Sequence, residues 1–198
     1  MGSAEKLVRL LERLETGRTS VIELVTSGRV PEPWTLYPGE DGIFDRRTRC
    51  QFYYHAHEGS DREAGHFHTV QLFSDHTIHL VAISMASTGW PQALFTVNLW
   101  AIGDRDESAA QLKLYARRFH LDERRGDPRL IRFVNLAFQT FLREIERLQD
   151  MKAERLVEHR LAHPGVDPFA DRSLEILSQV PIDVRARAGR RALVERPA

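Results

Sequence analysis

Four extended segments follow one another in the middle of the chain, and they constrain the fold more than any other feature. They span residues 51–57, 66–73, 78–85 and 93–102, are rich in aromatic and β-branched residues, and are separated by polar or Gly- and Pro-containing turns. Connections this short favour antiparallel neighbours, because a parallel pair needs a crossover of a dozen or more residues. The pattern predicts an antiparallel meander sheet of four or more strands.

Helical patterns lie on both sides of these segments. Apolar residues at helical spacing predict two helices before Gly28, a helix over 106–119, and a long helix that begins at Asp127-Pro128 and ends before His163. Strands that are apolar on both faces need cover on both, which helices can supply on one side and a second layer or a pocket on the other. The fold class expected is therefore α+β.

Three segments lie outside these helices and strands: 30–42, 173–179 and 185–198. Residues 30–42 carry three prolines and two glycines and predict a surface loop, while residues 173–179 fit a helix or a strand equally well. We expect a single α+β domain over 1–184. Residues 185–198 are basic and lack a core pattern, which indicates a disordered tail or a docking arm for an acidic partner.

Composition excludes several classes of partner. The 28 Lys and Arg residues balance 28 Asp and Glu residues, so no net positive field attracts nucleic acid. No apolar run is long enough to cross a membrane and no signal-peptide core is visible. A single cysteine, Cys50, cannot form an intramolecular disulfide, which fits a reducing cytoplasm. We expect a cytoplasmic protein with a small-molecule ligand or substrate, and a homo-oligomer remains open.

Histidine is the residue type that points to chemistry, since six of the nine histidines fall between His55 and His79. His55 and His57 are two apart on one expected strand, and His66 and His68 are two apart on the next. If the hairpin pairs His57 with His66, then His55 faces His68, and all four imidazoles share one face of the sheet. A slip of one residue would send one pair to the other face.

Imidazoles placed so closely can converge on one divalent transition metal ion, with metal–nitrogen distances of about 2.0–2.1 Å. Three neutral histidines with an open position suit zinc, copper or iron, whereas two histidines and a carboxylate suit Fe(II). Glu58, Asp61, Glu63 and Asp75 flank the cluster, and Glu63 is our candidate for proton transfer. His79 lies on the next expected strand. It joins the cluster only if the turn SDHT, residues 74–77, sets an odd register between the two strands.

Three further residues are candidates for substrate binding: Tyr53, Asn98 and Trp100. Together with His55, His57, His66 and His68 they suggest a metal-dependent oxidoreductase or hydrolase acting on a small molecule. The alternative is a non-enzymatic binding module whose histidines only form hydrogen bonds, because buried imidazoles need a partner for both nitrogens. An interaction protein that docks through its long helix and basic end is a third class.

The segments YYHAHEG, GHFHT, HLVAISM, LFTVNLW and HPGVDPFADRSLEI, in this order, resemble an uncharacterised bacterial family of unknown function. The resemblance runs from about Trp34 to Val184 and implies no activity. Its members tend to have Asn-Arg-Trp where this chain has Asn98-Leu99-Trp100, so a ligand bound by that arginine in relatives would lose this contact here.

Overall fold

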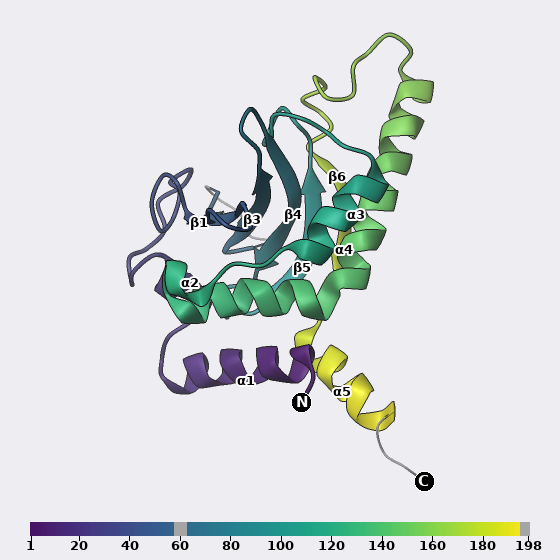
Figure 1. Cartoon of the computed structure of the whole chain (residues 1–198). Helices are drawn as coiled ribbons and strands as arrows, with labels where there is room; N and C mark the ends of the chain where they lie inside the picture. Colours follow the sequence, from purple (N-terminus) through teal and green to yellow (C-terminus); the bar gives the residue numbers. More distant parts are fainter. Residues whose placement is uncertain (58–62, 195–198) are drawn as a thin grey trace.

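The centre of the protein is one antiparallel sheet whose six strands lie in the order of the chain (Figure 1). The computed structural model describes residues 1–57 and 63–194, with side chains up to residue 189. The strands are β1 (Ile43–Asp45), β2 (Cys50–His55), β3 (Gly65–Leu72), β4 (Thr77–Met85), β5 (Pro91–Val97) and β6 (Ile176–Pro181). The predicted meander is confirmed. Two further strands extend it, and β6 forms in the segment that the sequence left undecided.

Helices supply the second layer. They are α1 (Ser3–Thr16), α2 (Val21–Val25), α3 (Ala109–Arg118), the 3₁₀ helix η1 (Glu123–Arg125), α4 (Pro128–Ala162) and α5 (Val184–Val194). The Asp127 side chain accepts a hydrogen bond of 2.8 Å from the Arg129 backbone N–H and caps α4, as its position before a proline predicts. The α+β class is therefore confirmed. Among the described helices, none is long and apolar enough to cross a membrane.

Where we expected a disordered tail from residue 185, the chain continues as helix α5. Its first turn is anchored by Arg185, whose guanidinium lies 4.1 Å from the Trp90 ring centroid, and by an ion pair between Arg187 and Glu144 of α4. A cation over an aromatic face and an ion pair with a neighbouring helix supply contacts that no local apolar pattern reveals. Residues 195–198 lie outside the described part of the chain.

The two faces of the sheet have different cover because side chains alternate along each strand. In β3, Phe67 faces the helices, and its ring lies 5.4 Å from that of Phe133 in α4. His66 and His68, the residues on either side, therefore point to the opposite face. Figure 1 shows α4 passing below the sheet and, after a kink at Phe141, rising along the β6 edge. The histidine-bearing face is left free of these helices.

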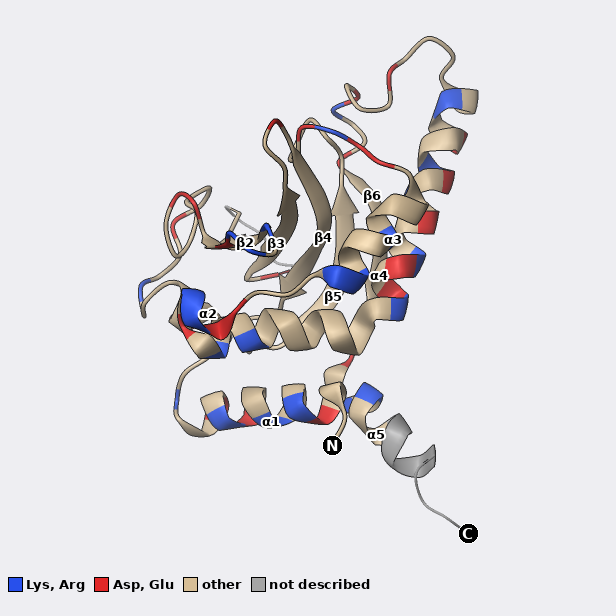
Figure 2. Cartoon of the chain, in the orientation of Figure 1, with Lys and Arg blue, Asp and Glu red and all other residues tan. Residues whose placement is uncertain are grey.

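The second half of α4 extends past the sheet, and Figure 2 shows acidic and basic residues alternating along it. Lys113 and Arg117 of α3 pair with Asp150 and Glu146 of α4. Since charges of both signs alternate and pair here, this face of α4 carries no extended field of one sign.

Candidate metal centre

The hairpin of β2 and β3 determines which histidines meet. His55 lies opposite His66, and Tyr53 lies opposite His68. This register is two residues away from the expected one, in which His57 faced His66 and His55 faced His68. Because the side-chain period is two, the shift changes the partners and keeps each side chain on its face. His55, His66 and His68 therefore share one face, and His57 lies beyond the end of β2.

The β3–β4 turn brings His79 to the same face, in the odd register that this placement requires. The turn pairs Leu72 with Thr77 and so Val70 with His79, and Val70 lies on the face of His66 and His68. The pairing of β3 with β4 shifts by one residue after Thr69, and Leu80 becomes the extra residue of a β-bulge. This bulge reverses the alternation of β4, so that Ala82, opposite His68, also lies on this face. His79 Nε2 lies 3.1 Å from His68 Nδ1, behind the ring that faces His55 and His66.

Three ring nitrogens converge at the centre of the cluster. The Nε2 atoms lie 2.7 Å apart for His55 and His66, 2.9 Å for His66 and His68, and 3.3 Å for His55 and His68. Nitrogen ligands about 2.0–2.1 Å from one ion, at angles between 90° and the tetrahedral value, lie about 2.9–3.4 Å apart. The triangle thus has close to the size of one face of a coordination shell, and this buried cluster could hold a metal ion.

The outer nitrogens determine where the protons are. His66 Nδ1 lies 2.6 Å from Glu63 Oε1, and an ionised carboxylate only accepts, so this nitrogen carries a proton. In a neutral His66 ring the Nε2 atom is then a lone-pair donor aimed at the other two Nε2 atoms. Nε2 atoms that carry lone pairs cannot satisfy one another at these distances, whereas a cation at their common centre can accept all three lone pairs. Outer hydrogen bonds of this kind also orient metal ligands in general.

Burial lowers the pKa of three imidazoles of the cluster, those of His55, His68 and His79. Loss of solvation lowers the pKa of His55 to about 3, and the nearby His66 adds to the effect. Burial also lowers the pKa of His79 to about 3, reinforced by the Lys152 ammonium, and holds the pKa of His68 well below its ordinary value. Since a neutral imidazole is the form that binds a metal, these side chains are in the ligand form at neutral pH.

The same shifts predict that the metal-free protein loses stability in acid. A histidine whose pKa is lowered by folding binds more protons when unfolded, so the free energy of unfolding falls as the pH drops below about 6.5. The midpoint of urea unfolding should fall between about pH 7.5 and pH 5. The variant His55→Asn/His79→Asn should show a shallower fall. A wild-type midpoint that stays constant over this range would contradict burial of these rings as neutral groups.

Glu63 stands beside the triangle with His57. Single ligand atoms of His57, Glu63 and His66 all lie within 4.8 Å of one another, which makes a second group that could hold an ion. Burial alone would raise the pKa of Glu63, but hydrogen bonds from His66 and Ser84 outweigh it, and the net pKa is lowered. The carboxylate is therefore ionised at neutral pH.

The other flanking carboxylates do not complete the cluster in the described residues. Asp75 is exposed and pairs with His76 in the β3–β4 turn, with 2.7 Å between Oδ1 and Nδ1. Glu58 and Asp61 lie outside the described residues. Glu63 is thus the flanking carboxylate that the described chain places against the histidines.

Gly65 lets β2 and β3 approach at the site. Its φ is +137°, and a Cβ there would lie 2.5 Å from the His55 carbonyl oxygen and 2.6 Å from the Tyr54 ring. We expect Gly65→Ala to lower the free energy of unfolding by about 1–3 kcal/mol and to weaken metal binding at least tenfold, because the strands must separate. Urea unfolding and metal titration check this.

Gly39→Ala is the matched control, since a Cβ at Gly39 would meet nothing within 4 Å. Unchanged metal affinity in Gly65→Ala would show that the spacing of β2 and β3 does not set the histidine geometry.

A cavity of about 590 Å³ opens in front of the cluster. Its volume falls within the range of about 300–1,000 Å³ usual for small-molecule sites. Aromatic rings form much of its wall: Trp34 lies 4.5 Å from the His57 ring, and Tyr53 lies 5.3 Å from the His68 ring. The histidine triangle therefore faces a space that a small molecule can enter.

Two of the three predicted substrate-binding residues, Tyr53 and Trp100, line this cavity, and Asn98 does not. Asn98 is fully buried, and its Nδ2 donates bonds of 2.7 Å to the carbonyl oxygens of Pro168 and Leu174. Its amide thus fastens the 168–174 loop to the end of β5. The amide donors of Asn98 are thus used within the protein, and its role in substrate binding stays a prediction from the sequence.

Sequence reasoning missed Trp34, Glu175 and Ile176, which also line the cavity. Trp34 belongs to the expected loop of 30–42, and its backbone N–H donates a bond of 3.0 Å to the Ala56 carbonyl beside β2. Glu175 and Ile176 arrive through the pairing of β5 with β6. These positions depend on contacts between residues distant in sequence. The one available signal was the pair of prolines before Trp34, which restrict the backbone there.

Comparison with known proteins gives a family and no activity. Residues 1–182 match the family described as "Domain of unknown function (DUF6969)", and the chain belongs to this family. The search of curated proteins and the search of solved structures each found no match.

Proposed function

We propose that this member of a family of unknown function binds one divalent transition metal ion through His55, His66 and His68, and acts with it on a small molecule in the adjoining cavity. The observation that carries the proposal is the triangle of three Nε2 atoms, with sides of 2.7, 2.9 and 3.3 Å. Three neutral imidazoles with an open position are a donor set that suits zinc, iron or copper.

The ion would supply Lewis-acid or oxygen-dependent chemistry to a molecule in the cavity, which makes the protein a metal-dependent hydrolase or oxidoreductase. The residues of the chain have distinct tasks in this proposal. Glu63 holds the proton on His66 Nδ1 and so keeps His66 Nε2 as a ligand atom. Glu63 and His57 both line the cavity, where they would exchange protons with a bound molecule.

The aromatic wall favours a second candidate, a binding module without catalysis. Trp34, Tyr53 and Trp100 offer ring faces and edges to a flat or apolar ligand, with the Glu175 carboxylate also at the cavity. This candidate needs no metal. It differs from the first in one measurable respect, which is the response of the protein to a chelator.

Thermal unfolding with and without metal tests the proposal. An ion that binds only the folded state stabilises it by about 2.7 kcal/mol at a hundredfold excess over its dissociation constant. Adding zinc, iron(II) or copper(II) to chelator-treated protein should therefore raise the Tm by several degrees, and chelator should reverse the change. A Tm indifferent to all three metals would overturn the proposal and leave the binding module.

His79 should matter although it is not among the proposed ligands. When His68 Nε2 binds the ion, the proton of the neutral ring is on Nδ1 and is donated to His79 Nε2, 3.1 Å away, which fixes the His68 ring. Loss of such an outer partner commonly costs 10–100-fold in metal affinity. We expect His79→Leu to weaken metal binding by this factor and His79→Gln, which can still accept, to recover part of it. Equal affinity of His79→Leu and wild type in a competition titration would show that this contact does not position His68.

A further inference from the structure

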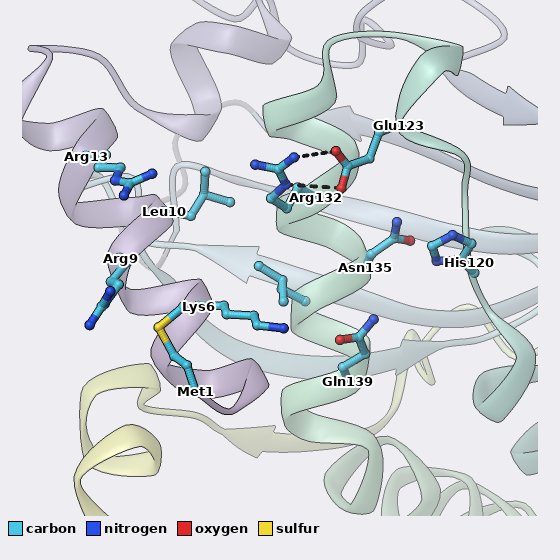
Figure 3. Close-up of a pocket in the computed structure, with 11 residues that line it drawn as sticks. Met1, Lys6, Arg9, Leu10, Arg13, His120, Glu123, Arg132, Asn135 and Gln139 are labelled. Atoms are coloured by element: carbon cyan, nitrogen blue, oxygen red, sulfur yellow. Dashed lines mark hydrogen bonds and ion pairs between the residues drawn. The ribbon is translucent and has the colours of Figure 1, made fainter. Parts of the chain in front are cut away.

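A second cavity lies between α1 and α4 and shares no residue with the histidine site. Its volume is about 400 Å³. Figure 3 shows its wall: Lys6 reaches from α1 toward α4, Arg13 points toward Arg132 of α4, and Gln139 and His120 stand on the far side. The chain has no net charge, so a cavity walled by cations from two helices is a local feature.

Three cations of α1 lie at this cavity. Lys6, Arg9 and Arg13 all line the cavity, and in the described part of the chain none of them takes part in an ion pair. This contrasts with α3 and α4, where Lys113, Arg117 and Arg132 each pair with a carboxylate. Like charges at one cavity repel, and an anion from outside removes this cost.

Arg132 is held in place and keeps free donors. Its Nε and Nη2 donate to the two carboxylate oxygens of Glu123, the former at 3.1 Å. A guanidinium has five N–H donors, so three stay available after these two bonds. Pairing with Glu123 fixes the plane of the group, as bidentate pairs do. Leu10 and Leu136 give the cavity an apolar part between the charged walls.

We propose that this cavity binds a phosphomonoester whose organic part is small and apolar. The phosphate dianion accepts from an ammonium and from planar guanidinium groups, which is the chemistry that Lys6, Arg13 and Arg132 offer together. The organic part contacts Leu10 and Leu136. The inference stands independently of the metal centre.

Calorimetric titration of the full chain with phenyl phosphate, inorganic phosphate and benzoate tests this. A chelator is present throughout, so that phosphate cannot bind a metal at the histidine cluster. Phenyl phosphate should saturate one site and bind at least threefold more tightly than the other two, because it alone combines a dianion with an apolar group. Benzoate binding as tightly as phenyl phosphate would overturn the phosphate assignment.

Two double variants that remove the same charge locate the site. Lys6→Gln/Arg13→Gln should weaken phenyl phosphate binding at least tenfold. Arg143→Gln/Arg147→Gln, at exposed positions of α4 outside the cavity, should leave it within twofold. Equal losses of phenyl phosphate affinity in both variants would mean that the ligand is attracted by the overall charge of the protein. Unchanged affinity in Lys6→Gln/Arg13→Gln would mean that the ligand binds outside this cavity. Either result, or no saturable binding by wild type, overturns the inference.

Discussion

His66→Ala should reduce the affinity for zinc, iron(II) or copper(II) at least a hundredfold. His66 Nε2 makes the two shortest contacts of the nitrogen triangle, at 2.7 and 2.9 Å, and His66 Nδ1 is the atom that Glu63 contacts. Its removal leaves two ligands of the triangle and takes the His66 hydrogen bond from the ionised Glu63 carboxylate. Competition titration against a chromophoric chelator measures the change.

His76→Ala is the matched control for this variant. It removes one imidazole from the neighbouring β3–β4 turn, where His76 pairs with Asp75 and stacks on Phe73, outside the cluster. Its metal affinity should stay within twofold of wild type. Equal losses in His66→Ala and His76→Ala would mean that the bound metal is held by histidines in general and not by the triangle.

Phe67→Ala should cost about 3–5 kcal/mol of unfolding free energy, the usual range for a buried phenylalanine. The ring is fully buried and packs on Phe52, Tyr54 and Phe133, with centroids 6.0, 5.0 and 5.4 Å away. The ring of Phe67, in β3, therefore contacts both the neighbouring strand β2 and helix α4. Urea unfolding measured by circular dichroism checks the value.

Leu161→Ala is the comparison for Phe67→Ala, since Leu161 is 76% exposed near the end of α4. Its truncation should change the unfolding free energy by less than about 0.5 kcal/mol. A loss in Phe67→Ala no larger than that of Leu161→Ala would contradict the placement of Phe67 between sheet and helix. That placement is also what directs His66 and His68 to the other face.

The meander was predictable because its information is local. Alternating and β-branched residues mark each strand, and short turns leave only antiparallel neighbours. The long helix was predictable for the same reason, from its cap and apolar stripe. Strand β6 could not be predicted, since it pairs with β5 and the two strands are separated in the sequence by α3 and α4. The helix α5 likewise depends on Arg185 and Arg187 finding Trp90 and Glu144 in the folded chain.

For the site, too, features set by local sequence could be predicted and features set by distant contacts could not. His55, His66 and His68 share a face because side chains alternate along a strand with a period of two. The observed register differs from the expected one by two residues, so each side chain stays on the expected face. The position of His79 depends on the odd register set by the β3–β4 turn, which pairs Leu72 with Thr77, and the sequence left both registers of this turn open. The bonds of Asn98 to the 168–174 loop could not be predicted, because a polar residue in an apolar strand indicates a need for partners without showing where they lie.

The metal content of the untagged protein tests the central claim most directly. After incubation with excess zinc, iron(II) or copper(II) and removal of the unbound ion, elemental analysis should find about one ion per chain for at least one of these metals. Substoichiometric content for all three would contradict a metal centre at the histidine triangle.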